Sequence, residues 1–392
     1  MARPSDRALL VSVAVGRPAA RTQATVQRDD ARAELRDLAV SAGLSVVGDL
    51  AVRRERPDPA LFIGSGKVIE LGEQMQTLGA GVAVFDVALS PVQQRNLERE
   101  LGAYALDRTG LILDIFSQRA KSREGRLQVE LARQEHLATR LVRGWSHLER
   151  QRGGLGKTGG PGEKQIELDR RLIGVRVKQL RAQLKTLHKQ RRTQRRARVR
   201  RNVFNVSLVG YTNAGKSTLF NAMTGATAYA ADQLFATLDT TSRRCSIAAE
   251  CDVVLSDTVG FIRGLPHELV AAFKSTLEET VDADLLLHVV DAASPTRAMQ
   301  MAEVQRVLSE IGADTVPQLV VFNKIDQIER APTIEHDPCA SMPAVYVSAR
   351  SGAGLDLLRA QVAAVIRASC VGRNEPAPAA EAALAIPISL TA

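Results

Sequence analysis

One eight-residue segment, Gly210 to Ser217, limits what this chain can fold into more than any other feature of its sequence. It fits the pattern G-x4-G-K-[ST], in which glycines let backbone N–H groups wrap phosphate oxygens. In such a loop Lys216 supplies a cation to the phosphates and the Ser217 hydroxyl binds Mg²⁺. The pattern needs a strand before it and a helix after it. Val206–Val209 and a helical stretch from Thr218 meet that need, so the segment predicts a phosphate-binding loop in an α/β domain.

Three later segments, each after a strand-like run, complete a guanine-nucleotide site. In Asp257-Thr-Val-Gly260 the aspartate can hold Mg²⁺ through water, and the glycine lets a backbone N–H approach the γ-phosphate. In Asn323-Lys-Ile-Asp326 the last carboxylate can accept both N1–H and N2–H₂ of guanine, a donor pair that adenine lacks. Ser348-Ala-Arg350 is expected to turn its backbone toward guanine O6. Four elements in this order predict a GTPase.

A segment between the first two elements, Phe235-Ala-Thr-Leu-Asp239, lies where a switch loop must offer a hydroxyl to Mg²⁺ and a carbonyl to the attacking water. From spacing alone, Thr237, Thr240 and Thr241 compete for that role. The residue after the Gly260 motif is Phe261, where many GTPases place a glutamine that orients the water. Phenylalanine cannot hydrogen-bond to water, although it can pack into a core. We therefore predict slow intrinsic hydrolysis that rises when a partner completes the site.

The first part of the chain, from residue 8 to about residue 115, alternates short apolar runs with helical stretches. Ser90-Pro91 is a good helix start, because serine can cap the first turn and proline fits its first position. Strand–helix alternation implies a small α/β domain with a mostly parallel sheet. The expected elements are strands at Ala8–Val15, Leu44–Val47 and Val82–Phe85 and a helix at Asp29–Ser41.

Residues 116 to 201 show longer helical repeats that predict an antiparallel helical hairpin with an apolar seam and outward basic residues. The first helix is marked by Leu127, Leu131, Gln134, Leu137 and Leu141, and the second by Ile166, Ile173, Val177, Leu180, Leu184 and Leu187. The glycine-rich loop Gly153–Gly162 joins them and is longer than a turn requires. A backbone-exposing tip that inserts into rRNA and a passive linker are both compatible with it.

Strand-like runs return after residue 203 and predict a doubly wound, mostly parallel sheet. These runs are Val206–Val209, Val253–Ser256, Leu285–Val290, Leu319–Phe322 and Val345–Val347. The predicted fold class is therefore α/β, with an N-terminal α/β domain at 1–115, a helical hairpin at 116–201, a P-loop GTPase domain at 202–368 and an Ala/Pro-rich tail at 369–392.

The positive charge of the chain is concentrated in one stretch. Between Ile173 and Asn202 there are twelve Lys/Arg and no Asp/Glu, and because the whole chain carries +9, the rest sums to −3. Such a stripe favours a polyanionic partner over a merely solvated helix face. No apolar run is long enough to span a membrane, the N-terminus lacks a secretory signal, and the four cysteines lack metal-ligand spacing. We expect a cytoplasmic protein with free thiols.

Five segments of the chain resemble the HflX family of translation-factor-class GTPases, and the resemblance runs from about residue 8 to about residue 365. They are Phe62–Val68, Leu113–Ala120, Leu127–Ala132, Gly153–Glu163 and Phe235–Asp239. The resemblance implies binding to the large (50S) ribosomal subunit, with the hairpin and its loop reaching toward the peptidyl-transferase region, and a role in dissociating or rescuing stalled ribosomes under stress. It also implies that Thr237, rather than Thr240 or Thr241, binds Mg²⁺. Members usually have proline at the position of Thr240.

The expected site follows from these segments, with Lys216, Thr237 and Gly260 as catalytic residues and Mg²⁺ held by Ser217 and Thr237 directly and by Asp257 through water. GTP or GDP contacts are expected from Gly210, Tyr211, Thr212, Asn213, Ala214, Gly215, Lys216, Ser217, Thr218, Phe235, Ala236, Thr237, Leu238, Asp239, Asp257, Thr258, Val259, Gly260, Asn323, Lys324, Ile325, Asp326, Ser348, Ala349 and Arg350. The expected partner is the large ribosomal subunit with its rRNA, met by a monomer. The alternative is a regulatory GTPase that acts on a protein effector without binding RNA.

Overall fold

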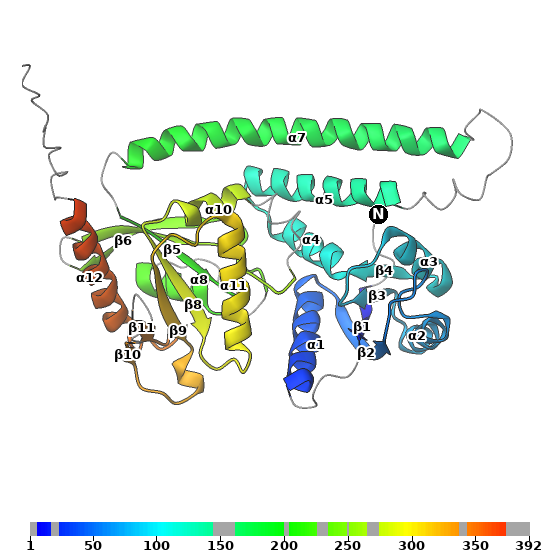
Figure 1. Ribbon diagram of the computed structural model, residues 1–392, viewed down its shortest axis with the longest axis horizontal. Helices are drawn as coiled ribbons and strands as arrows, with labels where there is room; N and C mark the ends of the chain where they lie inside the picture. Colours follow the sequence, from blue (N-terminus) through cyan, green and yellow to red (C-terminus); the bar gives the residue numbers. More distant parts are fainter. Residues whose placement is uncertain are drawn as a thin grey trace, which may run out of the picture.

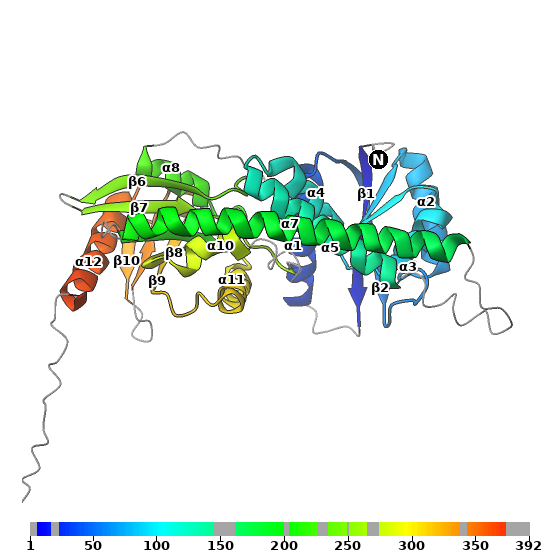
Figure 2. The same cartoon turned by 90° about the horizontal axis from the view of Figure 1, so that it is seen from above.

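Two mostly parallel sheets lie at opposite ends of the molecule, and the long helix α7 (Pro161–Val199) runs along one side of both (Figures 1 and 2). The structure is a computed structural model that describes residues 6–16, 23–143, 161–199, 204–225, 234–248, 251–264, 274–336 and 343–373. Within these residues the predicted α/β fold class is confirmed. None of the described helices has the length and apolar character that crossing a membrane requires.

The N-terminal sheet has the order β2-β1-β3-β4, and all its neighbouring strands are parallel. Its strands are β1 (Arg7–Val15), β2 (Ser45–Arg54), β3 (Val82–Phe85) and β4 (Tyr104–Asp107), and its helices are α1 (Gln23–Ser41), α2 (Ser65–Leu78), α3 (Pro91–Leu101) and α4 (Arg108–Arg119). Alternate residues of β1 pack against α1 and α4 on one face and α2 and α3 on the other. The predicted helix start is confirmed, because Ser90 and Gln93 form a reciprocal capping box at the start of α3.

The helical hairpin consists of α5 (Arg123–Arg143) and α7 (Pro161–Val199), which run antiparallel (Figure 1). Leu131 packs against Leu180 and Leu184 in the seam. Two ion pairs flank it, Arg176 with Glu130 at 2.5 Å and Arg181 with Glu135 at 2.7 Å. Most of the predicted glycine-rich loop lies outside the described residues, and its last two residues begin α7.

The C-terminal sheet has the order β10-β11-β9-β8-β5-β7-β6 and is parallel except at its two edge strands, β10 and β6. Its strands are β5 (Phe204–Gly210), β6 (Thr241–Ala248), β7 (Cys251–Asp257), β8 (Leu285–Asp291), β9 (Gln318–Asn323), β10 (Thr333–Glu335) and β11 (Ala344–Tyr346). Helices α10 (Lys274–Val281) and α11 (Arg297–Ile311) cover one face, and α8 (Lys216–Thr224) and α12 (Leu355–Arg373) cover the other. The parallel strands end together at one edge, which brings the predicted motifs into one region.

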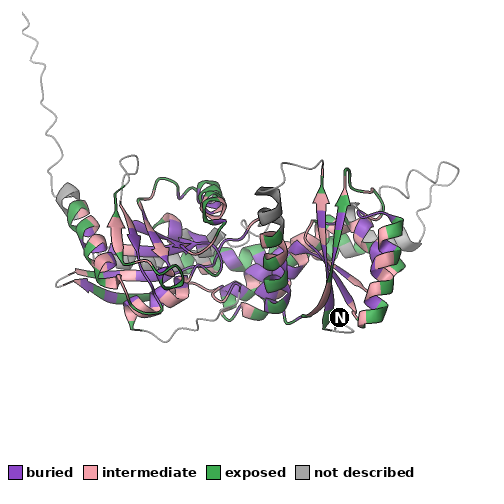
Figure 3. Cartoon of the chain, turned by 90° about the horizontal axis from the view of Figure 1, so that it is seen from below, coloured by how far each residue is buried: buried purple, intermediate pink, exposed green. Residues whose placement is uncertain are grey.

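A single apolar core joins the two α/β units. Leu35 and Leu38 of α1 and Phe116 of α4 belong to the same buried cluster as Phe235 and Phe261 of the GTPase domain. In Figure 3 the buried residues, drawn in purple, continue from one sheet to the other. A shared core of this kind means that the N-terminal unit packs directly against the segments that surround the phosphate-binding loop.

A polar cluster beside this core ties the phosphate-binding loop to the N-terminal unit. The hydroxyl of Tyr211 hydrogen-bonds to the carboxylate of Glu34 in α1, and Glu34 also forms an ion pair with Arg108 of α4. The guanidinium of Arg108 donates to the carbonyl oxygen of Arg263 at 2.9 Å, and the backbone N–H of Arg263 donates to the Tyr211 hydroxyl at 2.8 Å. The phosphate-binding loop, through Tyr211, and the segment after Gly260, through Arg263, therefore both bond to Glu34 and Arg108 of the N-terminal unit.

Candidate nucleotide-binding site

The phosphate-binding loop leaves β5 at Gly210 and enters α8 at Lys216. Two of its glycines are required by space as well as by conformation. Gly210 has φ +151°, and a Cβ there would lie 2.2 Å from the carbonyl oxygen of Val289. Gly215 has φ +89°, and a Cβ there would lie 2.3 Å from the side-chain amide nitrogen of Asn323. The loop thus gains its tight path from residues with no side chain.

Lys216 extends into the loop and is only 6% exposed. Its ammonium donates to the carbonyl oxygens of Gly210 and Tyr211, at 3.1 and 2.8 Å. Burial lowers the pKa of Lys216 to about 8, against the opposing influence of the Asp257 carboxylate. A poorly solvated cation at the base of a loop of backbone N–H groups is a site for an anion, because an anion replaces the lost solvation of the charge.

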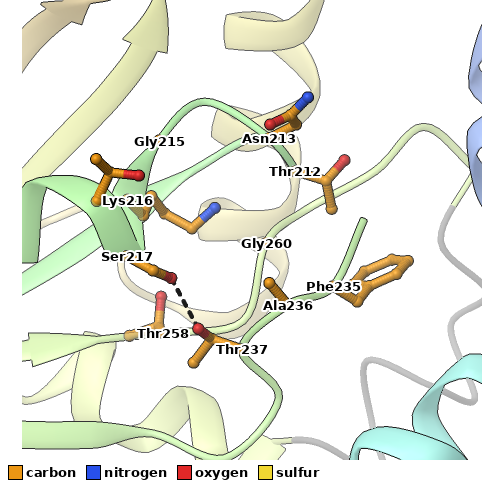
Figure 4. A pocket seen from close by; sticks show the side chains of 11 residues that line it. Thr212, Asn213, Gly215, Lys216, Ser217, Phe235, Ala236, Thr237, Thr258 and Gly260 are labelled. Atoms are coloured by element: carbon orange, nitrogen blue, oxygen red, sulfur yellow. Dashed lines mark hydrogen bonds between the residues drawn. The ribbon is translucent and has the colours of Figure 1, made fainter. Parts of the chain in front are cut away.

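The side chains of Ser217, Thr237 and Asp257 converge beside this lysine, and Figure 4 shows the first two. The Ser217 hydroxyl donates to the Asp257 carboxylate at 2.6 Å and lies 2.7 Å from the Thr237 hydroxyl, which is itself 2.9 Å from the same carboxylate oxygen. The second carboxylate oxygen of Asp257 is buried and has no hydrogen-bond partner among the described residues. Burial raises the pKa of Asp257, while hydrogen bonds from Ser217 oppose the rise. Mg²⁺ prefers oxygen ligands, so this set of groups fits that ion.

The pocket in front of these groups is closed on one side by Gly260. A Cβ at Gly260 would lie 2.8 Å from the methyl carbon of Thr212 and 3.0 Å from the Lys216 ammonium, so a larger residue would displace both. The hydroxyl of Thr212 is buried without a hydrogen-bond partner in the described structure. The pocket is lined by Thr212, Asn213, Gly215, Lys216, Ser217, Thr218, Phe235, Ala236, Thr237, Thr258 and Gly260. Of the three candidate threonines, Thr237 lines it, whereas Thr241 begins strand β6.

The base-reading motifs meet at the ends of β9 and β11. Asn323 is 2% exposed, donates to the carbonyl oxygen of Ala214 and accepts from the N–H of Ala349, both at 2.9 Å. It therefore ties the phosphate-binding loop to the Ser348–Arg350 segment. The exposed Asp326 accepts a hydrogen bond from the Ser348 hydroxyl at 2.6 Å, which holds its carboxylate in place. Lys324 pairs with Asp291 at 2.7 Å, and Ile325 is buried.

Phe261 is fully buried in the core that joins the two α/β units. Its backbone N–H donates to the carbonyl oxygen of Gly210 at 3.1 Å, and its own carbonyl oxygen accepts from the N–H of Thr212 at 2.7 Å. The core-packing interpretation of Phe261 is therefore correct. The side chain at this position faces apolar neighbours and supplies no polar group to a water molecule at the γ-phosphate.

Several residues expected at the nucleotide have side chains that face elsewhere. Tyr211 points to Glu34 of the N-terminal unit, and Leu238 and Val259 are buried in the shared core. The carboxylate of Asp239 bonds to the start of helix α5. Only the backbone of these residues is free to serve a nucleotide. Phe235 lines the pocket and also packs edge-to-face on Phe116, with ring centroids 4.7 Å apart.

Three protein-family models match the chain along its length. Their descriptions are GTP-binding GTPase N-terminal for residues 29–117, GTP-binding GTPase Middle Region for residues 119–198 and 50S ribosome-binding GTPase for residues 205–324. Among solved structures, the complex of SsGBP with GDP is 24% identical, with a TM-score of 0.51, and the alignment covers 93% of this chain and 99% of that one. This likeness bears on the fold.

Curated relatives are closer in sequence. GTPase HflX of Escherichia coli strain K12 is 54% identical over 326 residues, covering 83% of this chain and 76% of the relative. GTPase HflX of Caldanaerobacter subterraneus subsp. tengcongensis is 45% identical over 358 residues, covering 91% and 80%. The resemblance inferred from the motifs is therefore confirmed, and the chain belongs to the HflX family of GTPases, enzymes that bind and hydrolyse GTP.

Proposed function

We propose that the protein is a GTP-dependent factor that binds the large ribosomal subunit through its rRNA and dissociates or rescues stalled ribosomes under stress. The observation that carries the proposal is that the switch segment of the nucleotide pocket bonds, through Asp239, to the start of a helical hairpin whose second helix is strongly basic. The match of residues 205–324 to a 50S ribosome-binding GTPase supports the choice of partner. A ribosomal partner implies action in the cytoplasm, and we propose that the protein acts there as a monomer.

In the proposed site the nucleotide lies between the phosphate-binding loop and Asp326. Lys216 and the backbone of the loop bind the phosphates, and Asp326 accepts the two guanine donors. Ser217 and Thr237 would hold Mg²⁺ directly and Asp257 through water. The ion would neutralise charge on the β- and γ-phosphate oxygens. Gly260 leaves space for its backbone N–H to approach the γ-phosphate.

Hydrolysis by the isolated protein is proposed to be slow because the described site lacks a side chain that orients the attacking water. The equivalent position is occupied by the buried Phe261. A partner must then complete the site, either by supplying a polar group or by moving the switch segment. Once the partner has completed the site, hydrolysis of GTP would release the factor, so the lifetime of GTP would set how long the factor stays bound.

Cosedimentation with ribosomal subunits tests the proposed partner. We expect the protein to travel with the large subunit about tenfold more in a non-hydrolysable GTP analogue than in GDP, since only the GTP state offers the switch segment a γ-phosphate to bind. Sucrose gradients run in GDP, GTP and the analogue measure this ratio. Equal sedimentation in all three nucleotides would contradict a nucleotide-controlled ribosome factor.

Charge reversal on α7 separates an RNA-binding factor from a GTPase that acts on a protein effector. Changing Arg191, Arg192, Arg195 and Arg196 to Glu should abolish cosedimentation, and each lost phosphate contact should lower the slope of log affinity against log salt by about 0.9. The matched control changes the same four residues to Lys, which keeps the charge and should keep most of the binding. Unchanged cosedimentation of the Glu variant would favour the protein-effector alternative.

A further inference from the structure

The switch segment is fastened to the first helix of the hairpin by Asp239, which lies two residues after Thr237. One carboxylate oxygen of Asp239 accepts hydrogen bonds from the backbone N–H groups of Lys121 and Ser122, at 2.9 and 2.8 Å. The other accepts from the Ser122 hydroxyl at 2.5 Å. These donors lie immediately before α5, so a residue more than a hundred positions away in the sequence binds the backbone at the start of the hairpin.

A glycine in the first turn of α5 makes room for this contact. A Cβ on Gly125 would lie 2.3 Å from the carboxylate oxygen of Asp239, closer than any real contact allows. The N–H of Gly125 also donates to the Ser122 hydroxyl at 2.8 Å, which completes the link. Glycine is less favourable than alanine in a helix because it loses more conformational freedom on folding. The close approach of Asp239 supplies a structural reason for a residue that otherwise weakens the helix.

The switch segment Phe235–Asp239 is also held by the side chains of Phe235 and Leu238. The ring of Phe235 packs on Phe116 of α4, and Leu238 is 2% exposed in the shared core. Between these anchors Thr237 faces the opposite way, with its hydroxyl 2.7 Å from Ser217 and 2.9 Å from Asp257. The placement of Thr237 at the nucleotide therefore depends on contacts made with α4 and with the start of α5.

We propose that Asp239 is a positioning residue for GTP hydrolysis, which anchors the switch segment to the base of the hairpin and so holds Thr237 at the Mg²⁺ and γ-phosphate position. The proposal rests on the role proposed above for Thr237. Its consequence is directional: a partner that shifts the start of α5 shifts Thr237 with it. The anchor concerns the GTP state only, because GDP has no γ-phosphate for Thr237 to serve.

The test measures binding of GDP and of a non-hydrolysable GTP analogue, both with Mg²⁺ and without ribosomes. Asp239→Ala and Gly125→Ala should each weaken binding of the analogue by about 5- to 150-fold, the usual range for coupling between sites, while GDP affinity stays within about twofold. Gly125→Ala is the more informative variant because it displaces the Asp239 carboxylate without changing any residue of the GTPase domain. Single-turnover hydrolysis should fall in both variants.

Two comparisons make the outcome decisive. Gly174→Ala, in α7, is the matched control, because its Cβ would meet nothing within 4 Å, and it should bind both nucleotides like the parent chain. The double variant of Asp239→Ala and Gly125→Ala should match Asp239→Ala alone, since the new methyl group then has no carboxylate to strike. Additive losses would overturn the proposal.

Thr237→Ala distinguishes failure of this proposal from failure of the proposed site. If Thr237→Ala weakens the analogue but Asp239→Ala and Gly125→Ala do not, the anchor is refuted and the site assignment stands. If Thr237→Ala has no effect on either nucleotide, the assigned role of Thr237 fails, and the anchor fails with it. Should Asp239→Ala not fold, Asp239→Asn keeps the side-chain shape and removes the charge, and it should give a smaller loss in the same direction.

Discussion

Replacing Asp326 by Asn should lower the affinity for GTP and GDP by about 10- to 100-fold, since one of the two guanine donors would lose its acceptor, at about 1–3 kcal/mol. The carboxylate is exposed at the end of β9 and is held by the Ser348 hydroxyl at 2.6 Å, so it is ready to accept both donors without rearrangement. An asparagine of the same shape offers one acceptor, and its amide group meets the second guanine donor unfavourably.

The same substitution should raise the affinity for xanthine nucleotides. Xanthine carries a carbonyl where guanine carries its amino group, so the asparagine amide gains an acceptor while its oxygen still accepts N1–H. Titration of the guanine and xanthine nucleoside diphosphates against the parent chain and the variant measures the change in base preference. Asp252→Asn is the control, because Asp252 is an exposed carboxylate paired with Arg244 and outside the pocket. A variant that kept its guanine preference would show that another group reads the base.

Replacing Lys216 by Ala should reduce single-turnover GTP hydrolysis by about 10²–10³-fold, the usual loss when one preorganised electrostatic group is removed. The ammonium is 6% exposed and sits among carbonyl oxygens of the loop, where its charge is poorly solvated and its interaction with phosphate is correspondingly strong. Nucleotide binding should weaken as well, because the γ- and β-phosphates lose their only buried cation among the described pocket residues.

The thermal shift on adding GTP provides an independent measure of the Lys216 substitution. A ligand that binds only the folded state stabilises it in proportion to the logarithm of its concentration over Kd, so a weaker ligand gives a smaller shift. Lys216→Arg should not restore activity, since the larger planar guanidinium does not fit a buried space shaped for an ammonium. Lys178→Ala, at an exposed position of α7, should leave both readouts unchanged.

The strands that carry the nucleotide motifs could be predicted from the sequence because the sheet is covered on both faces. Runs such as Leu319–Phe322 are then continuously apolar and end at a polar motif, and β9 follows this run closely. Strand β6, at Thr241–Ala248, is an edge strand whose exposed polar residues hide the pattern. Strand β2 extends to Arg54, beyond the predicted Leu44–Val47, because its outer half alternates buried and exposed residues.

The contacts between distant parts of the chain could not be predicted in this way. In the phosphate-loop pattern any residue can stand at position 211, so the pattern does not predict that the Tyr211 hydroxyl bonds to Glu34, 177 residues away in the sequence. Asp239 was expected at the nucleotide because it follows Thr237, but its carboxylate turns to Ser122. Such pairings depend on how the two α/β units pack, and no local period in the sequence records that packing. The contact of Asp239 with the start of α5 is the one through which we propose that the hairpin influences hydrolysis.

Single-turnover GTP hydrolysis, measured with and without large ribosomal subunits, tests most directly whether this is a partner-controlled switch. The buried Phe261 predicts a rate for the isolated protein in the range of unassisted GTPases, about 10⁻⁴–10⁻² s⁻¹, and a rise of at least about 100-fold when the subunit is added. A fast rate for the isolated protein, or a slow rate that the subunit leaves unchanged, would contradict a partner-controlled switch.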